Sequence, residues 1–178
     1  QLHQLSGKKI FLWLSHDRPK KGLSIVLNAW KDSEILQNEG VLLVVGAKRT
    51  EDIKGVQFIG QVPYTAVPEY YKLAHVYLFP TLWKEGFGLS LAQAICSGCY
   101  CIAADNGGVS DFFTINDGVL IQQPNIVSHW TQNMEMALNA IEQGWINQKP
   151  GNQILDFTQW SQQFAGIFTK WENRFHKE

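Results

Sequence analysis

The stretch VYLFPTLWKEGFGLSLAQAICSGCYCIAAD, residues 76–105, carries the clearest signal of the fold. It begins with a β-branched and aromatic run at residues 76–80 and ends with a second apolar run at residues 100–105. Between these runs, glycines lead into small and apolar residues with the spacing of a helix. A strand, a helix and a second strand in this order predict two parallel strands joined by a helical crossover.

The rest of the chain repeats this alternation of short apolar runs with longer helical periods. The expected strands are residues 8–15, 41–46, 56–60, 76–80, 100–105 and 118–122. The expected helices are residues 22–31, 66–73, 86–97, 109–113 and 126–143. This pattern predicts an α/β fold, a Rossmann-like doubly wound parallel sheet of about six strands.

Length and charge exclude several classes of protein. A chain of 178 residues suits one domain, because domains most often have roughly 100–150 residues. Lys and Arg number 15 against 16 Asp and Glu, and no basic cluster predicts a nucleic-acid partner. No stretch approaches the ~18 consecutive apolar residues of a membrane helix, and no signal peptide is recognisable. We expect one soluble domain, residues 1–178.

The three cysteines gather in CSGCYC, as Cys96, Cys99 and Cys101. This spacing allows a metal knuckle, but no fourth ligand lies near it in the sequence. Free cysteine behaves as a small buried hydrophobe, and Cys101 begins an expected strand. We therefore expect three buried thiols, a reducing compartment and no metal.

The C-terminal part of the chain carries a second apolar signal. The large apolar residues of its helical stripe are Phe157, Trp160, Phe164, Ile167, Phe168, Trp171 and Phe175. Such a stripe can pack on the sheet of this domain or on a second domain, and the sequence leaves both alternatives open.

Charges and glycines follow the expected strands. The segments after the first five strands are HDRPKKG at 16–22, GAKRT at 46–50, GQVPY at 60–64, TLWKEGFG at 81–88 and DNGGVSD at 105–111. In open parallel sheets a ligand binds beyond the carboxyl ends of the strands. All five segments would lie at that edge, and glycine allows the backbone to approach a ligand closely.

The expected helix at 86–97 has an unusual outer face. Phe87, Leu91 and Ile95 would face the core, whereas the second stripe consists of small or polar residues, Gly86, Ser90, Gln93 and Ser97. Tight packing against a neighbouring helix would also select small residues. It does not explain Glu85, a carboxylate beside the helix N-terminus, where the helix dipole stabilises an anion.

Glu85 and Gln93 could contact opposite ends of one extended ligand. Eight helical residues rise about 12 Å, and the free amides at the helix N-terminus can bind phosphate between the two side chains. A carboxylate also accepts hydrogen bonds from sugar hydroxyls. This arrangement predicts a site for a sugar nucleotide.

The segment HDRPKKG supplies the candidate cations His16, Arg18, Lys20 and Lys21. Lys21 lies nearest to the expected helix start at Gly22, so we expect it to contact a diphosphate. His16 could carry a proton instead. The alternative is that these loop residues are simply solvated.

On these residues, the sequence resembles the C-terminal, donor-binding domain of retaining glycosyltransferases of the GT-B fold, in glycosyltransferase family 4. The resemblance runs from IFLWLSHDRPKKG, which begins at residue 10, to FTQWSQQFAGIFTKW, which ends at residue 171. It implies that Lys21 binds the donor diphosphate. His16 stands where the family commonly has an arginine, and Arg18 is the alternative for that role.

The resemblance also assigns roles around Glu85. The family motif E-x7-E places its first carboxylate at Glu85, against the donor sugar, and makes Lys21 and Glu85 the catalytic pair. The main chain of Gly86, Phe87, Gly88 and Leu89 would lie near the sugar and phosphates. The second carboxylate of the motif, which holds the ribose, is replaced here by Gln93. A neutral hydrogen bond is worth roughly 0.5–1.5 kcal/mol against about 1.5–3 kcal/mol for one to a charge, so we expect ribose binding about tenfold weaker.

The loop at residues 60–63 resembles the base-binding loop of the family. The main chain of Gln61 and Val62 would contact the nucleobase. Recognition by the main chain leaves no side-chain code for the identity of the base.

The resemblance implies that the parent protein transfers a glycosyl group, with retention, from a nucleoside diphosphate sugar. The acceptor would be held by an N-terminal domain that has no counterpart in this chain. The terminal helix, residues 155–178, would cross to that domain, and this domain alone would be inactive. No cofactor or metal is expected beyond the donor. The expected location is cytoplasmic, with membrane association through the other domain left open.

Two other functions stay open on the sequence. A nucleotide-sugar epimerase of the same architecture would need acid and base residues from both domains. A non-catalytic sugar-nucleotide sensor or assembly domain would explain Gln93 in place of a carboxylate.

Overall fold

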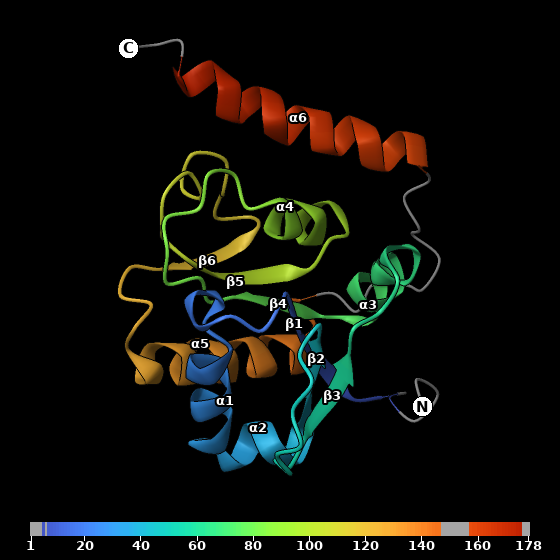
Figure 1. Ribbon diagram of the computed structural model, residues 1–178, viewed down its shortest axis with the longest axis vertical. Helices are drawn as coiled ribbons and strands as arrows, with labels where there is room; N and C mark the ends of the chain where they lie inside the picture. The colour runs from blue at the N-terminus through green and yellow to red at the C-terminus, as the bar shows by residue number, and fades with distance from the viewer. Residues whose placement is uncertain (1–4, 6, 147–156, 176–178) are drawn as a thin grey trace.

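The computed structural model describes residue 5, residues 7–146 and residues 157–175. Its centre is one six-stranded, all-parallel sheet with the strand order β3-β2-β1-β4-β5-β6 (Figure 1). The strands are β1 (Lys9–Leu14), β2 (Gly40–Val45), β3 (Val56–Gly60), β4 (Val76–Phe79), β5 (Tyr100–Ala104) and β6 (Gly118–Ile121). The predicted Rossmann-like sheet is therefore confirmed.

Helices cover both faces of the sheet. The helices are α1 (Leu23–Lys31), α2 (Glu34–Glu39), α3 (Val67–Leu73), α4 (Leu89–Cys96), α5 (Val127–Glu142) and α6 (Phe157–Phe175), with short 3-10 helices η2 (Pro19–Lys21) and η3 (Tyr64–Ala66). Helices α1, α2 and α5 pack on one face, and α3, α4 and α6 lie on the other (Figure 1). The sheet is thus doubly wound. None of the helices in the described ranges has the length and hydropathy that a membrane span requires.

Burial on both faces explains the composition of the central strands. All six residues of β2 are buried, as expected for a parallel strand that helices cover on both sides. Three fully buried tryptophans lie in the core between the sheet and helices α1 and α5, namely Trp13, Trp30 and Trp130. Each indole donates its hydrogen to a main-chain carbonyl, over 3.2 Å, 3.0 Å and 2.9 Å respectively. Their large apolar area is therefore buried without an unpaired donor.

The structure corrects three helix predictions. Helix α4 begins at Leu89 rather than at residue 86, because Gly88 has φ +76 and forms the N-cap. Phe87 therefore precedes the helix, and Glu85 and Gln93 do not lie on one continuous helix. The segment 109–113 forms turns instead of the expected short helix, and α2 was missed. Ser33 starts α2, since its side chain accepts a hydrogen bond from the Leu36 amide.

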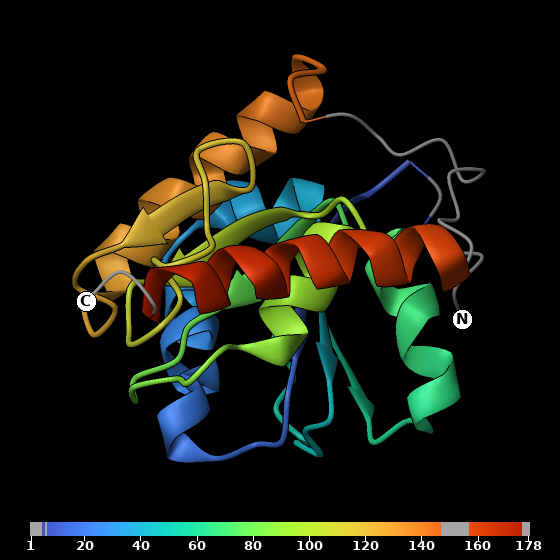
Figure 2. The same ribbon diagram turned by 90° about the horizontal axis from the view of Figure 1, so that it is seen from above.

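Helix α6 packs on the side of the molecule that carries α4 (Figures 1 and 2). The ring of Phe87 contacts Phe164, Phe168 and Trp171, with centroid distances of 6.1, 5.5 and 5.4 Å. This part of the apolar stripe therefore packs on its own domain, although Phe168 keeps 39% of its surface exposed. The predicted crossing to a second domain stays a prediction. Residues 155–156 and 176–178 of the predicted terminal helix lie outside the described part of the chain, and so do the side chains of Phe157, Trp160 and Phe175.

The three cysteines are free and buried, as predicted. Burial raises the pKa of the Cys96 thiol to about 11. Cys99 and Cys101 lie in the apolar layer between the sheet and α4. In the described ranges, no three side chains of the metal-binding types gather into a site.

Candidate functional site

The site lies at the topological switch point of the sheet. Strand order reverses between β1 and its neighbour β4, and the helices that follow these strands, α1 and α4, lie on opposite faces (Figure 1). The chain therefore leaves β1 and β4 toward opposite faces at the carboxyl edge, and such a point is where ligands bind in open parallel sheets. Lys21 comes from the first of these loops and Glu85 from the second.

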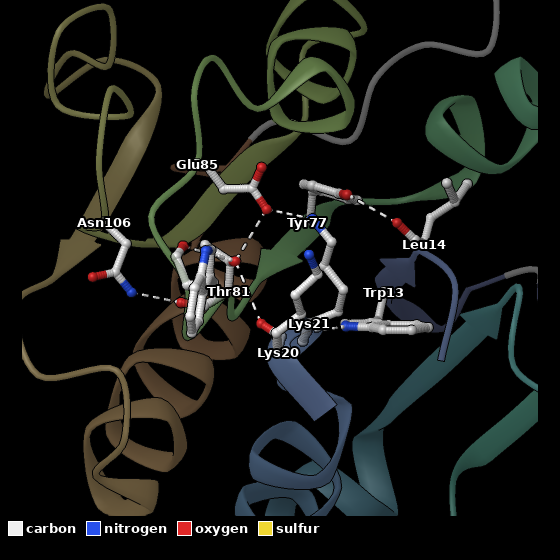
Figure 3. A network of polar contacts seen from close by, with 9 residues as sticks. Trp13, Leu14, Lys20, Lys21, Tyr77, Thr81, Glu85 and Asn106 are labelled. Atoms are coloured by element: carbon white, nitrogen blue, oxygen red, sulfur yellow. Dashed lines mark hydrogen bonds and ion pairs between the residues drawn. The ribbon is translucent and has the colours of Figure 1, made fainter. Parts of the chain in front are cut away.

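The side chains of Lys21 and Glu85 meet at this edge (Figure 3). The Lys21 ammonium donates to Glu85 Oε1 and forms an ion pair with it. The two side chains keep only 26% and 20% of their surface exposed, so water screens the pair less than it screens an exposed one. The buried Thr81 hydroxyl lies closest to the same oxygen, at 3.1 Å, and shares its single hydrogen with the main-chain carbonyls of Trp83 and Lys20, at 3.3 and 3.4 Å. Sequence reasoning brought out Lys21 and Glu85 but missed Thr81.

The loop that carries Lys21 is pressed against the loop after β4. Gly22, which follows Lys21, has φ +70, and a Cβ built there would lie 1.9 Å from the Pro80 carbonyl oxygen. Only glycine fits this approach. The Leu82 amide donates to the Lys20 carbonyl over 2.8 Å and joins the two loops again. These main-chain contacts therefore hold the Cα atom of Lys21 in place beside the loop after β4.

The loop after β5 holds the main chain of Glu85. The Gly108 amide donates to the Glu85 carbonyl over 2.9 Å, and the Glu85 amide donates to the Asn106 carbonyl over 3.4 Å. A Cβ on Gly107 would lie 2.2 Å from the Glu85 carbonyl oxygen. The Asn106 side chain donates to the Thr81 carbonyl over 2.7 Å (Figure 3). The predicted glycine-rich segment after β5 thus supports the carboxylate without touching it.

The N-terminus of α4 follows Glu85 closely. Gly88 is its N-cap and provides no side chain to cap the first amides, which have no partner within the helix. Gly86 and Leu89 are exposed and Phe87 is half-buried. The structure therefore leaves donors near Glu85 for an anion, although the helix starts later than the sequence predicted.

Gln93 lies on α4 and contacts two tyrosines. Its amide nitrogen donates to the Tyr64 hydroxyl over 3.1 Å. The Tyr71 hydroxyl lies 3.4 Å from Gln93 Oε1 and 3.1 Å from the Ser90 carbonyl oxygen, donating to both. Burial is the main cause that raises the Tyr71 pKa well above its ordinary value, so its hydroxyl stays protonated. No sequence pattern pointed to either tyrosine.

The predicted base-binding loop follows β3. Gln61 is exposed and Val62 is half-buried. A pocket of about 270 Å³ opens beside this loop, between the segments after β2 and β3, and its lining includes Lys48, Arg49 and Gln61. Lys21 and Glu85 do not line this pocket, so the pocket and the ion pair are separate features of the same sheet edge.

His16 and Arg18 share a loop with Lys21, but both are exposed. Within the described ranges, neither side chain has an acidic partner within 4.0 Å. The structure therefore brings Lys21, and neither of the other two cations, to Glu85.

Asp17 has a structural task on this loop. Two nitrogens of the Arg49 guanidinium donate to its two carboxylate oxygens over 2.8 and 2.9 Å. This bidentate pair joins the loops after β1 and β2. The hydrogen bonds from Arg49 are the main cause that lowers the pKa of Asp17 below its ordinary value of 3.8.

Replacing Asp17 by Asn should reduce stability at neutral pH by less than about 1 kcal/mol, since both partners are partly exposed. A carboxylate whose folded-state pKa is lowered stabilises the fold above its ordinary pKa, and the contribution is lost as pH falls through the folded-state pKa. The difference between wild type and Asp17→Asn in urea unfolding should therefore shrink as the pH falls below the ordinary aspartate pKa of 3.8, and vanish once the carboxyl is protonated in the folded state as well. Asp52→Asn is the matched control at an exposed aspartate. A difference that persists in acid would contradict this account.

Comparison with known protein sequences gives consistent matches. The family model of glycosyl transferases group 1 matches residues 1–140. The phosphatidyl-myo-inositol mannosyltransferase of Mycobacterium leprae is 28% identical over 107 residues, which cover 56% of this chain and 29% of the relative. The 2-deoxystreptamine N-acetyl-D-glucosaminyltransferase of Niallia circulans is 29% identical over 136 residues, which cover 70% of this chain and 35% of the relative. The chain thus spans about a third of the length of these relatives.

Solved structures agree on the fold. Sucrose-phosphate synthase from Thermosynechococcus elongatus superposes with a TM-score of 0.67 at 18% identity, over 95% of this chain and 44% of that one. HepE from Anabaena, solved with UDP and glucose, superposes with a TM-score of 0.67 at 17% identity, over 94% and 50%. Both matches cover nearly all of this chain and at most half of the other. The fold is thus that of the C-terminal domain of GT-B glycosyltransferases, and the chain belongs to the glycosyl transferases group 1 family.

Proposed function

We propose that this chain is the donor-binding domain of a retaining glycosyltransferase and holds a nucleoside diphosphate sugar at the switch point of its sheet. The observation that carries the proposal is the meeting of Lys21 and Glu85 from the loops after β1 and β4. A cation and a carboxylate side by side suit a ligand that has a diphosphate joined to a sugar, because each side chain matches one of the two groups.

Lys21 would exchange its partner when the donor binds. The diphosphate takes the place of Glu85 at the Lys21 ammonium, and the amides at the N-terminus of α4 add further donors. As the bond to the sugar breaks, negative charge grows on the leaving diphosphate. A fixed cation at this position stabilises that charge and so lowers the barrier.

Glu85 would then turn to the sugar. The Thr81 hydroxyl, 3.1 Å from Oε1, keeps the carboxylate in place after Lys21 has left it. An oriented carboxylate accepts hydrogen bonds from sugar hydroxyls and fixes the position of the anomeric carbon relative to the acceptor. Thr81 acts here as a positioning residue.

The nucleoside would extend from the diphosphate toward Gln61. The main chain of Gln61 and Val62 would contact the base, with the pocket between the loops after β2 and β3 beside it. Gln93 would lie at the ribose. These assignments follow the family resemblance, and the position of Gln61 on the lining of the pocket supports them.

Transfer itself would need more than this domain. The mannosyltransferase and the N-acetylglucosaminyltransferase are each about three times longer than the part that matches this chain, and their names describe transfer of mannose or N-acetylglucosamine. We propose a hexose donor, an acceptor held by a second domain, and a chain that binds the donor but does not transfer it alone. The cytoplasmic location, and membrane association through the second domain, stay predictions.

A non-catalytic sensor is the second candidate, and Gln93 is the observation that favours it. A carboxylate would bind the ribose more strongly than this amide does. If Gln93→Glu raised donor affinity and the natural protein showed no turnover with any donor, the sensor would be the better proposal.

Calorimetric titration of the chain with UDP-, GDP- and ADP-glucose and with GDP-mannose tests donor binding. We expect one base to be preferred, with a dissociation constant between about 1 µM and 1 mM, the usual range for enzyme substrates. The free nucleoside without phosphates should bind at least about tenfold more weakly, because it cannot reach Lys21. Absence of binding by all four donors would contradict the proposed function.

A further inference from the structure

Tyr64 is an exposed aromatic residue that touches the site. It keeps 74% of its surface exposed, so burial of its ring does not explain its position. It begins η3, directly after Pro63 and two residues after Val62. Its hydroxyl crosses from this segment to α4, where it accepts a hydrogen bond from Gln93 over 3.1 Å. Tyr64 thus connects the proposed base loop to the proposed ribose residue.

The hydroxyl of Tyr64 still has a hydrogen to donate. A phenol can accept and donate at the same time, and here it accepts from the Gln93 amide. Within the described residues, no acceptor for its own hydrogen is found. Because the side chain is largely exposed, this hydrogen is available to a ligand that lies against α4.

The amide oxygen of Gln93 retains capacity for a second hydrogen bond. A carbonyl oxygen has two acceptor positions, and one receives the Tyr71 hydroxyl over 3.4 Å. That hydroxyl also donates to the Ser90 carbonyl over 3.1 Å, so its single hydrogen is shared. Gln93 therefore offers one acceptor beside the one donor that Tyr64 offers.

We propose that Tyr64 is a second ribose-binding residue and that it acts as a pair with Gln93. The inference rests on the proposed function. Each ribose hydroxyl can donate and accept, so one hydroxyl donates to Gln93 Oε1 and the other accepts from the Tyr64 hydroxyl. A carboxylate would accept from both hydroxyls. The tyrosine and the amide together thus restore a two-point contact with the ribose.

The pair makes a specific prediction for nucleotides that lack the ribose hydroxyls. Tyr64→Phe removes one oxygen and leaves the ring, so its effect should be limited to ligands that carry the 2′ and 3′ hydroxyls. The affinity for UDP, GDP or ADP, whichever binds most tightly, should fall about 5- to 10-fold. The affinity for the matching 2′,3′-dideoxynucleoside diphosphate should change less than about twofold.

The test is calorimetric titration of wild type, Tyr64→Phe and Tyr70→Phe with both nucleotides. Tyr70 is a matched control, because it lies on α3 near Tyr64 and no described hydrogen bond joins it to Gln93. Circular dichroism verifies that each variant is folded. Tyr70→Phe should bind both nucleotides as wild type does.

The outcomes distinguish failure of the ribose role of Tyr64 from failure of the proposed function. If Tyr64→Phe binds the ribonucleotide as wild type does, or loses the same factor for both nucleotides, the ribose role of Tyr64 is wrong and the proposed function stands. If wild type binds no nucleoside diphosphate, the proposed function fails and the inference fails with it.

Discussion

Replacing Lys21 by Met is expected to weaken binding of the nucleoside diphosphate roughly 100-fold. A hydrogen bond to a charged group contributes about 1.5–3 kcal/mol, and each 1.4 kcal/mol is about tenfold in affinity. Lys21 is three-quarters buried and points into the site. Its loss also leaves the Glu85 carboxylate without its cation, so that the like charge of the diphosphate is repelled. Calorimetry with the preferred nucleoside diphosphate measures the effect.

Lys20→Met is the matched control for this prediction. Lys20 is the neighbour of Lys21 in the sequence, has the same charge and is exposed. Its described contacts use the main-chain carbonyl, which accepts hydrogen bonds from Leu82 and Thr81. The control should bind within about threefold of wild type, because exposed charges contribute little. If Lys21→Met also stayed within that range, Lys21 would not be a diphosphate ligand.

Replacing Glu85 by Gln is expected to change the affinities for the nucleoside diphosphate and for the nucleoside diphosphate sugar in opposite directions. The nucleoside diphosphate without sugar should bind about threefold more tightly, because Lys21 no longer has to leave a carboxylate. The nucleoside diphosphate sugar should bind about 10- to 30-fold more weakly, because sugar hydroxyls lose their charged acceptor. The ratio of the two dissociation constants, from parallel titrations, isolates the role of Glu85 from any general damage to the site.

Glu69→Gln provides the control for loss of an ion-paired glutamate. Glu69 forms an exposed ion pair with Lys72 on α3. Its replacement should leave both dissociation constants unchanged. A Glu85→Gln variant that bound both ligands more weakly by the same factor would show that Glu85 only maintains the local structure.

The sheet and the main pair of the site could be predicted because their signals are local. Each strand is a short apolar run, and β2 is apolar throughout because both its faces are covered. Lys21 and Glu85 could be named because each follows a strand and precedes a helix. Parallel strands bring such positions to one edge of the sheet, whatever the details of the loops.

The parts that were missed depend on contacts between distant segments. Thr81 lies in an ordinary loop sequence, and only the folded loop brings its hydroxyl to Glu85. The late start of α4 depends on the left-handed conformation of Gly88, since glycine fits a helix start and a turn equally well. The contact between Tyr64 and Gln93 joins residues 29 positions apart, and no periodic pattern in the sequence predicts it.

A crystal structure of the chain with its preferred nucleoside diphosphate sugar would show whether the donor lies between Lys21 and Glu85. We expect the Lys21–Glu85 ion pair to be broken, the Lys21 ammonium to donate to a diphosphate oxygen, and Glu85 to contact a sugar hydroxyl. A donor bound at another part of the chain, with Lys21 and Glu85 still paired, would contradict this expectation.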